Sequence, residues 1–314
     1  PVALNLLVLV VEIADAFALA LVNSFDTAVR PATNFAAILS PRIRITDFYT
    51  ANRQHERWAM LTSYDQYTAE LFDEAGVWAL LVGDSAANNV YAYETTLPVT
   101  VDELLPLVRA VVKSTKRAFV IGDLPFGSYE DGPSQALETS IRFMKEGGCH
   151  AVKFEGGLRV AEQIRKVADA GIPVMGHIGF TPQSEHQLGG YRVQGRGDDA
   201  GRLLSDAHAV AEAGAFATVL EMVPGDLARQ VTAELDIPTV GIGAGPDCDA
   251  QVLVWQDMAG LRRGRIQRFV KQYANLAKII GDAAAAYVDD VRSGTFPSEQ
   301  HTFASTIPSS EARS

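Results

Sequence analysis

Carboxylate side chains end several short apolar runs in this sequence. Asp84 follows LLVG, Asp123 follows FVIG, Glu155 follows AVKF, and Glu221 follows ATVL. Asp84 and Asp123 are 39 positions apart, Asp123 and Glu155 are 32 apart, and Glu155 and Glu221 are 66 apart. These separations match one, one and two strand–helix units, so the four groups are expected to meet where parallel strands end. Such a mouth can hold a divalent metal and a small oxo-acid.

The run AVKFE carries two ionisable residues within five positions. Alternation along a strand places Lys153 and Glu155 on one face, and Val152 and Phe154 on the other. If the apolar pair faces surrounding helices, the charged pair points into the interior, where an unpartnered charge costs several kcal/mol. Compensation must come from a metal, from a substrate anion, or from a satisfied internal ion pair. We expect a binding site here.

The type of donor indicates the metal. Asp84, Asp123 and Glu155 offer hard oxygen ligands, which suit Mg²⁺ better than zinc. Zinc more often recruits His and Cys, and only His177, at the end of PVMGH, is in position. An imidazole there serves a structural role as readily as a catalytic one. Asp65 is expected only to cap the helix that follows it.

The elements that position these residues alternate regularly from Trp58 onward. Eight β-branched or apolar runs are predicted as strands, at residues 59–64, 79–82, 118–121, 151–154, 173–177, 217–220, 239–242 and 252–255. Helical patterns between them include residues 101–114, 134–146, 160–170, 201–213 and 226–235. Gly147, Gly171 and Gly214 are expected as left-handed caps. Eight strands in parallel βαβ units predict an α/β fold, a single (β/α)8 TIM barrel. No GxGxxG motif follows the first predicted strand, which argues against a dinucleotide-binding sheet.

The length of 314 residues suits one barrel with an extension, because such barrels take about 250 residues. We predict a catalytic barrel at residues 42–303, an N-terminal extension of uncertain order at 1–41, and a polar tail at 304–314. The first 22 residues are apolar enough to suggest a signal or membrane segment. However, no basic stretch precedes them, and Glu12 and Asp15 interrupt the run. We therefore expect an appended segment without a catalytic role.

Composition limits the partners. The net charge is −11, from 38 acidic and 27 basic residues, and we expect neither a nucleic-acid partner nor a membrane partner. Cys149 and Cys248 are the only cysteines and form no CxxC motif. A disulfide framework or thiolate zinc site is not expected, and a reducing, cytoplasmic location follows.

Two glycine-rich segments have open interpretations. GIGAG at 241–245 follows the seventh predicted strand, where barrels often bind phosphate, but glycine equally permits a tight turn. GGYRVQGRG at 189–197 follows the fifth strand and predicts either a mobile loop over the mouth or a plain surface loop.

A series of motifs in fixed order resembles ketopantoate hydroxymethyltransferase, also called 3-methyl-2-oxobutanoate hydroxymethyltransferase. The resemblance runs from about Arg42 to Phe303. The motifs are GDS (83–85), TTLPVT (95–100), DLPFGSY (123–129), VKFEGG (152–157), GHIGFTPQS (176–184), GGYRVQGRG (189–197), LEMVP (220–224) and GIGAG (241–245).

The resemblance implies one reaction of pantothenate and coenzyme A biosynthesis. A one-carbon unit passes from 5,10-methylenetetrahydrofolate to 3-methyl-2-oxobutanoate and gives 2-dehydropantoate. Mg²⁺ would act as a Lewis acid on the keto-acid while a base removes a proton beside the keto group. Homo-oligomers, commonly decamers, are also implied. By motif match, the implied roles are Mg²⁺ and substrate contacts for Asp84 and Asp123, metal completion for Glu155, substrate binding for Ser85 and Lys153, and general base for Glu221.

Departures from the family pattern lie away from the implied ligands and base. They are Ala86–Asn89 after GDS, Glu185 and His186 after TPQS, and a basic stretch at 261–264 that replaces a more neutral one. They leave the folate contacts unassigned.

Two competing functions remain. A lyase related to phosphoenolpyruvate mutase or isocitrate lyase often needs a reactive cysteine, and neither cysteine is placed for that role. A catalytically inactive scaffold should have lost an ionisable mouth residue, and this chain keeps all of them.

Overall fold

The computed structural model describes residues 41–303. The predicted polar tail and, except for Pro41, the predicted extension lie outside the described residues. Among the described residues, no helix combines the length and apolar character that crossing a membrane requires.

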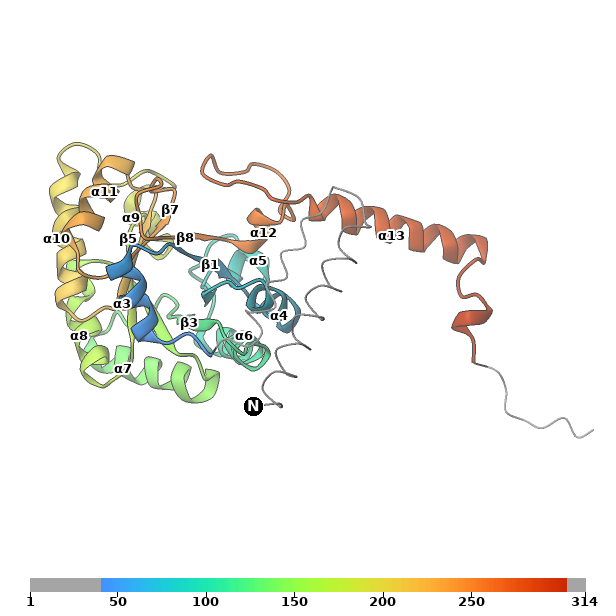
Figure 1. The fold of residues 1–314 in the computed structure, drawn as a ribbon, viewed down its shortest axis with the longest axis horizontal. Coiled ribbons are helices and arrows are strands. Elements are labelled where there is room, and N and C mark those ends of the chain that lie inside the picture. The colour runs from blue at the N-terminus through green and yellow to red at the C-terminus, as the bar shows by residue number, and fades with distance from the viewer. Residues whose placement is uncertain (1–40, 304–314) are drawn as a thin grey trace, which may run out of the picture. The chain divides into compact units, whose positions relative to one another are not determined.

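Eight parallel strands close into one barrel in chain order, with β8 pairing back to β1 (Figure 1). The prediction of a (β/α)8 barrel is therefore confirmed. The strands are β1 (Trp58–Thr62), β2 (Ala79–Val82), β3 (Phe119–Asp123), β4 (Ala151–Glu155), β5 (Val174–Gly179), β6 (Ala217–Glu221), β7 (Thr239–Ile242) and β8 (Ala250–Leu253).

Strand positions follow the predictions within a few residues. Strands 79–82 and 239–242 match without a shift, whereas the eighth begins two residues earlier than predicted. The prediction that Trp255 ends this strand is wrong, because Trp255 begins the short helix α12 (Trp255–Met258). Its backbone N–H donates to Thr62 Oγ1 at 3.1 Å, so the chain has already left the sheet ladder.

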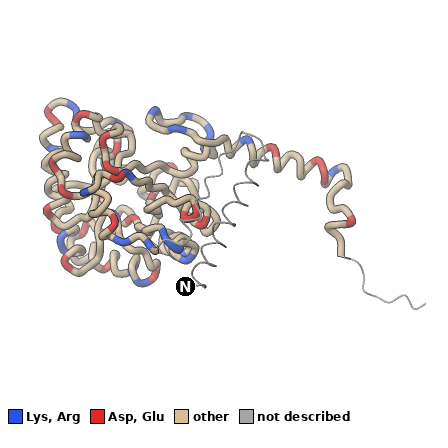
Figure 2. Tube along the Cα trace, viewed as in Figure 1, with Lys and Arg blue, Asp and Glu red and all other residues tan. Residues whose placement is uncertain are grey.

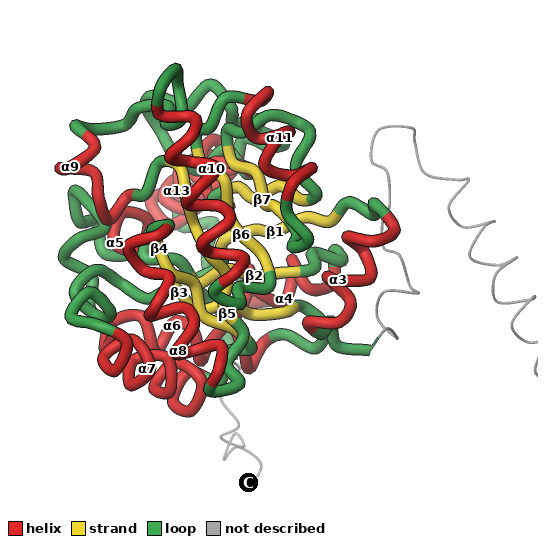
Figure 3. Tube along the Cα trace, turned by 90° about the vertical axis from the view of Figure 1, so that its left-hand side faces the viewer, coloured by secondary structure: helices red, strands yellow, loops and turns green. Residues whose placement is uncertain are grey.

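Helices surround the strands, and acidic and basic residues are interspersed along them (Figures 2 and 3). Short helices α5 (Ala86–Asn89) and α9 (Glu185–Leu188) lie in loops. The outer helices are α4 (Gln66–Glu74), α6 (Val101–Ser114), α7 (Pro133–Arg142), α8 (Ala161–Asp169), α10 (Asp199–Glu212) and α11 (Gly225–Glu234).

Helix ends follow local chemistry. Asp65 caps α4 as predicted, because its side chain accepts from the backbone N–H groups of Tyr67 and Thr68. Gly171 and Gly214 adopt positive φ as predicted, but the third left-handed residue is Gly148, and the prediction for Gly147 is wrong. Helix α7 continues into a π turn over Phe143–Gly147, which displaces the cap by one residue.

Successive side chains along the strands pack alternately into two apolar clusters, one inside the barrel and one beneath the outer helices. Ile121, Met175 and Val219 belong to the cluster inside the barrel, while Val120 and Val152 pack beneath the outer helices. Odd-numbered positions of β3 to β6 therefore face the interior, which is the face predicted for Lys153 and Glu155.

Helix α3 (Ile45–Gln54) closes one end of the barrel. Its fully buried Phe48 packs against Trp58, Phe119 and Phe216 at ring-centroid distances of 4.8, 5.2 and 5.6 Å. These three aromatic residues begin or precede their strands, so α3 covers the N-terminal end. The C-terminal strand ends are left for a site.

Helix α13 (Leu276–Ser293) is the longest described helix and has no buried residue. Its apolar side chains include exposed Ile279, Ile280, Tyr287 and Val291.

Candidate active site

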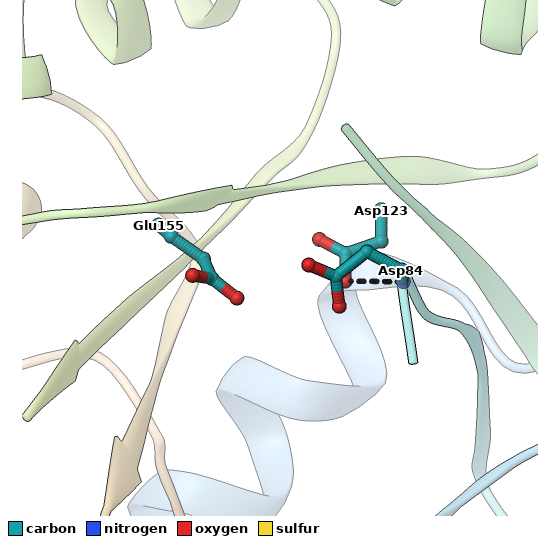
Figure 4. Close-up of side chains that lie close together, drawn as sticks. All are labelled: Asp84, Asp123 and Glu155. Atoms are coloured by element: carbon teal, nitrogen blue, oxygen red, sulfur yellow. Dashed lines mark hydrogen bonds between the residues drawn. The ribbon is translucent and has the colours of Figure 1, made fainter. Parts of the chain in front are cut away.

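Three carboxylates converge at the C-terminal mouth of the barrel (Figure 4). Asp123 and Glu155 are the last residues of β3 and β4, and Asp84 follows β2 by two residues. One oxygen from each lies within 4.8 Å of the others, and all three residues are buried. Asp84 N–H donates to Asp123 Oδ2 at 3.0 Å, which fixes the two residues relative to one another. The spacing allows one ion to bind all three.

Lys153 lies beside this group with an exposure of only 2%. Its Nζ is 2.8 Å from Asp123 Oδ1 and 3.5 Å from Glu155 Oε1. The internal ion pair considered as an alternative is therefore present, but it is incomplete. Three carboxylates and one ammonium leave −2 when all are ionised, and a divalent cation balances that charge.

The pKa values of Asp84 and Lys153 reflect the same excess of negative charge. Burial, reinforced by Asp123 and Glu155, raises the pKa of Asp84 well above its usual range. Burial would also lower the pKa of Lys153, but Asp123, Glu155 and Asp84 outweigh it and raise that pKa above its usual range. The lysine thus stays charged while Asp84 resists ionisation. A cation of charge +2 would relieve this repulsion.

His177 links the carboxylate group to Glu221. Its Nδ1 lies 3.3 Å from Glu155 Oε1, and its Nε2 lies 3.3 Å from Glu221 Oε2. Burial and Lys153 lower the pKa of His177, but the contacts with Glu155 and Glu221 raise it to about 9. Glu221 ends β6, and its side chain is 14% exposed. The carboxylate therefore faces the cavity, while its Oε2 contacts the buried imidazole of His177.

Ser85 is positioned by a residue that the sequence analysis assigned only to a strand. The hydroxyls of Tyr64 and Ser85 lie 2.8 Å apart, and Tyr64 is buried. Ser85 shares the wall of one cavity with Asp84, Lys153 and Glu221. The predicted site residues therefore occur together in the structure.

Gln183 is a further site residue that the sequence reasoning did not single out. Its Nε2 donates to Asp84 Oδ2 at 3.0 Å and to Leu124 O at 2.9 Å. Its backbone N–H donates to Glu155 Oε2 at 2.9 Å, and its Oε1 accepts from the Tyr129 hydroxyl at 2.5 Å. One buried residue thus orients two of the three carboxylates, Asp84 through its side-chain amide and Glu155 through its backbone N–H. The motif GHIGFTPQS contained this residue, but nothing in its spacing indicated the role.

Replacement of Gln183 by Leu is expected to weaken Mg²⁺ binding by about tenfold, because loss of a group that orients a metal ligand typically costs this much. The backbone bond to Glu155 would remain. Isothermal titration with MgCl2 measures the change. Gln187→Leu, at an exposed position on α9, is the matched control. An unchanged Mg²⁺ affinity in folded Gln183→Leu would contradict this role.

The cavity at the mouth has a volume of about 350 Å³. Tyr191, Arg262 and Phe269 line it together with the carboxylates. A larger hollow of about 680 Å³ lies beside α10, lined by Arg159, Arg202 and other residues, but contains none of the convergent carboxylates. The smaller cavity is therefore the candidate for chemistry.

The two glycine-rich segments contribute differently. Tyr191, from 189–197, lines the mouth and packs against Phe180 at a centroid distance of 4.5 Å, which supports a covering loop. Gly243 has φ +66°, and a Cβ there would lie 2.8 Å from the Phe269 ring. The GIGAG segment therefore needs glycine for close approach, which favours the turn interpretation over a phosphate site.

Both cysteines are free and buried. Burial raises the pKa of Cys149 to about 12, so its thiol is a poor nucleophile. Neither cysteine lines the mouth cavity. The arrangement lacks the reactive cysteine associated with the lyase alternative.

Solved structures with a similar fold include a member of the superfamily named in that alternative. Phosphonopyruvate hydrolase complexed with oxalate and Mg²⁺ matches with a TM-score of 0.53 at 13% identity, over 82% of this chain and 92% of the other. The 2,3-dimethylmalate lyase, a member of the PEP mutase/isocitrate lyase superfamily, matches with a TM-score of 0.52 at 16% identity, over 82% and 91%. At these identities the likeness supports the barrel fold alone.

Sequence relatives are far closer. The 3-methyl-2-oxobutanoate hydroxymethyltransferase of Saccharopolyspora erythraea is 63% identical over 262 residues, which cover 83% of this chain and 89% of the relative. The protein of the same name from Mycobacterium leprae is 60% identical over 274 residues, 87% of this chain and 96% of the relative. The family model for ketopantoate hydroxymethyltransferase matches residues 42–299. This chain therefore belongs to the ketopantoate hydroxymethyltransferase family.

Proposed function

We propose that the protein transfers a hydroxymethyl group from 5,10-methylenetetrahydrofolate to 3-methyl-2-oxobutanoate and forms 2-dehydropantoate, a step of pantothenate and coenzyme A biosynthesis. The observation that carries the proposal is the mouth itself. Three buried carboxylates converge within 4.8 Å, and Glu221 faces the same cavity. The identity of the keto-acid, 3-methyl-2-oxobutanoate, is taken from the names of the relatives.

Asp84, Asp123 and Glu155 would hold Mg²⁺, whose preference for oxygen ligands and whose charge both suit this group. When bound there, the ion would supply the positive charge of a Lewis acid to the bound keto-acid. Ser85 would donate a hydrogen bond to the keto-acid, and the Lys153 ammonium would attract its carboxylate. Both side chains line the same cavity as Glu221. Bound there, they would orient the substrate with its C3 carbon toward Glu221.

Glu221 would act as the general base. Its carboxylate takes the C3 proton, and the electron pair of that C–H bond forms the enolate. The carried methylene is bonded to two folate nitrogens; water adds to this carbon, both C–N bonds break, and the two nitrogens take up the protons of the water. The enolate carbon then bonds to the resulting formaldehyde-level carbon, and the alkoxide formed takes the proton held by Glu221 to become the product hydroxyl. His177, 3.3 Å from Glu221 Oε2, is a positioning residue that holds the carboxylate toward the cavity.

Product formation separates this function from its competitors. We expect 2-dehydropantoate only when keto-acid, Mg²⁺ and 5,10-methylenetetrahydrofolate are all present, measured by mass spectrometry of the reaction. Product without the folate would favour a different keto-acid enzyme. No turnover of a folded, metal-loaded protein would favour the inactive scaffold.

We also propose a homo-oligomer, for which the family resemblance favours a decamer. Helix α13 supports self-association because it has no buried residue and exposes Ile279, Ile280, Tyr287 and Val291. Apolar side chains along one free-standing helix are typical of an interface. A second copy of the chain is the partner proposed for it.

Residues 42–303 are proposed to contain the whole catalytic unit, and residues 1–41 and 304–314 to have no catalytic role. Every residue of the mouth cavity lies between Thr62 and Phe269. Free Cys149 and Cys248 support the proposal of a reducing, cytoplasmic location. Neither a membrane nor a nucleic acid is proposed as a partner.

A further inference from the structure

The segment between α12 and α13 is strongly basic in an otherwise acidic protein. Residues 261–272 read LRRGRIQRFVKQ, with five basic residues and no acidic one, whereas the whole chain carries a net charge of −11. Figure 2 shows these basic positions along one extended loop. We call residues 261–272 the basic loop.

Contacts place this loop at the mouth of the site. Arg262 Nε lies 2.7 Å from Asp257 Oδ1, and its NH2 group donates to Asn89 Oδ1 at 2.7 Å. Phe269 packs against Gly243 of the β7 loop. Arg262, Gln267 and Phe269 line the same cavity as the convergent carboxylates. The loop is therefore one wall of the entrance.

A second hollow of about 450 Å³ lies along the basic loop. Arg262 lines both this hollow and the mouth cavity, so the two spaces meet at one side chain. Arg263, Gly264, Ile266 and Lys278 also line the second hollow. A ligand reaching into the mouth could extend past Arg262 along this wall.

Most of these cations have no acidic partner. Among residues 41–303, Arg263, Arg265 and Arg268 are exposed and form no ion pair, and Lys271 lies over the Tyr273 ring at 4.7 Å instead. Free guanidinium groups bind carboxylates through paired N–H donors. Their spread along an extended loop fits a flexible chain of several carboxylates better than one compact anion.

We propose that the basic loop binds the glutamyl carboxylates of the one-carbon carrier and favours carriers with several glutamyl units. This inference rests on the proposed function. The carried methylene must enter the cavity beside Glu221, while the glutamyl end of the carrier lies at the opposite end of the molecule. That end would leave through the mouth, where Arg262 lines the cavity and Arg263 lines the adjoining hollow. Arg265 and Arg268 follow within a few residues on the same exposed loop.

The test compares 5,10-methylenetetrahydrofolate carrying one or five glutamyl units. We expect the wild-type KM to be about tenfold lower for the longer carrier, since several modest surface ion pairs act together. The preference should vanish in a variant with Arg263→Gln, Arg265→Gln and Arg268→Gln, and at 0.5 M NaCl, about where exposed charges are screened. The kcat with the one-glutamyl carrier should be unchanged in this variant.

The matched control is a variant with Lys113→Gln, Lys145→Gln and Lys166→Gln. It removes three exposed charges near the C-terminal ends of α6, α7 and α8. It should keep the wild-type preference. Equal KM values for both carriers, or a preference that survives in the triple arginine variant, would overturn the inference while leaving the proposed function standing. Absence of transfer with either carrier would overturn the proposed function as well.

A probe without the reactive end tests the loop directly. Penta-γ-glutamate should inhibit competitively against the five-glutamyl carrier, and this inhibition should weaken about tenfold in the triple arginine variant. Inorganic tripolyphosphate that inhibits as strongly would contradict the assignment to a carboxylate chain, because the loop would then bind any polyanion.

Discussion

Replacement of Glu221 by Gln is expected to lower kcat by at least about 100-fold while the keto-acid still binds, since a general base contributes about 10²–10⁴-fold. Gln has the same shape and can still lie against His177, but it cannot accept the C3 proton. The buried His177 ring keeps Glu155 Oε1 at 3.3 Å, so the exchange does not leave the imidazole without a carboxylate partner. Steady-state kinetics measure kcat, and isothermal titration measures keto-acid affinity.

Glu94→Gln is the control for this prediction. Glu94 lines the same cavity but is exposed and does not contact His177. Its replacement should leave kcat within a few-fold of the wild type. Near-normal turnover in Glu221→Gln would remove Glu221 from the role of base, and equal losses in both variants would point to the cavity charge instead.

Replacement of Asp84 by Asn should weaken Mg²⁺ binding by at least about 100-fold, because even loss of a residue that only orients a metal ligand costs up to that amount. Turnover should fall in parallel. The metal-free variant should be no less stable than the metal-free wild type. The change removes the Asp84 carboxyl group, whose pKa is raised by burial and by the neighbouring carboxylates. This combination separates loss of metal from loss of fold.

Thermal unfolding with and without Mg²⁺ measures both effects. A ligand at 100 times its Kd stabilises the native state by about 2.7 kcal/mol, or roughly 5 °C in Tm here. The wild type should show this shift and lose it in EDTA. Asp84→Asn should show no shift at the same Mg²⁺ concentration. An unchanged shift in the variant would mean that the ion binds elsewhere.

Periodicity in the sequence predicted the parts of the site that regular strands position. Asp123, Lys153, Glu155 and Glu221 all lie on strands whose odd-numbered residues face the interior. Two-residue alternation and the recurrence of whole βα units are enough to place them on one face and at one end.

Residues outside regular elements were harder to predict. Gln183 lies in a 3-10 turn (Pro182–Ser184), where no repeat indicates which way an amide points. Its role depends on Asp84, which is 99 positions away in the sequence. Phe48 was missed for a similar reason, because its burial depends on aromatic residues from three distant strands.

Strand and helix ends shifted where tertiary contacts competed with local preference. The hydrogen bond from Trp255 to Thr62 ends the eighth strand, and the π turn after α7 moves the left-handed cap to Gly148. Helix α13 was not predicted at all, and its apolar residues find no partner within the described part of the chain. Local patterns do not indicate such contacts.

The most direct test of the metal and base site follows the C3 proton of 3-methyl-2-oxobutanoate in D2O by NMR, without folate. We predict exchange of this proton with Mg²⁺, loss of exchange in EDTA, and recovery when Mg²⁺ is restored. Exchange requires only the carboxylates that hold the ion and a base facing the substrate, so it tests their joint action before any transfer. No exchange in the folded, Mg²⁺-loaded protein would contradict the account.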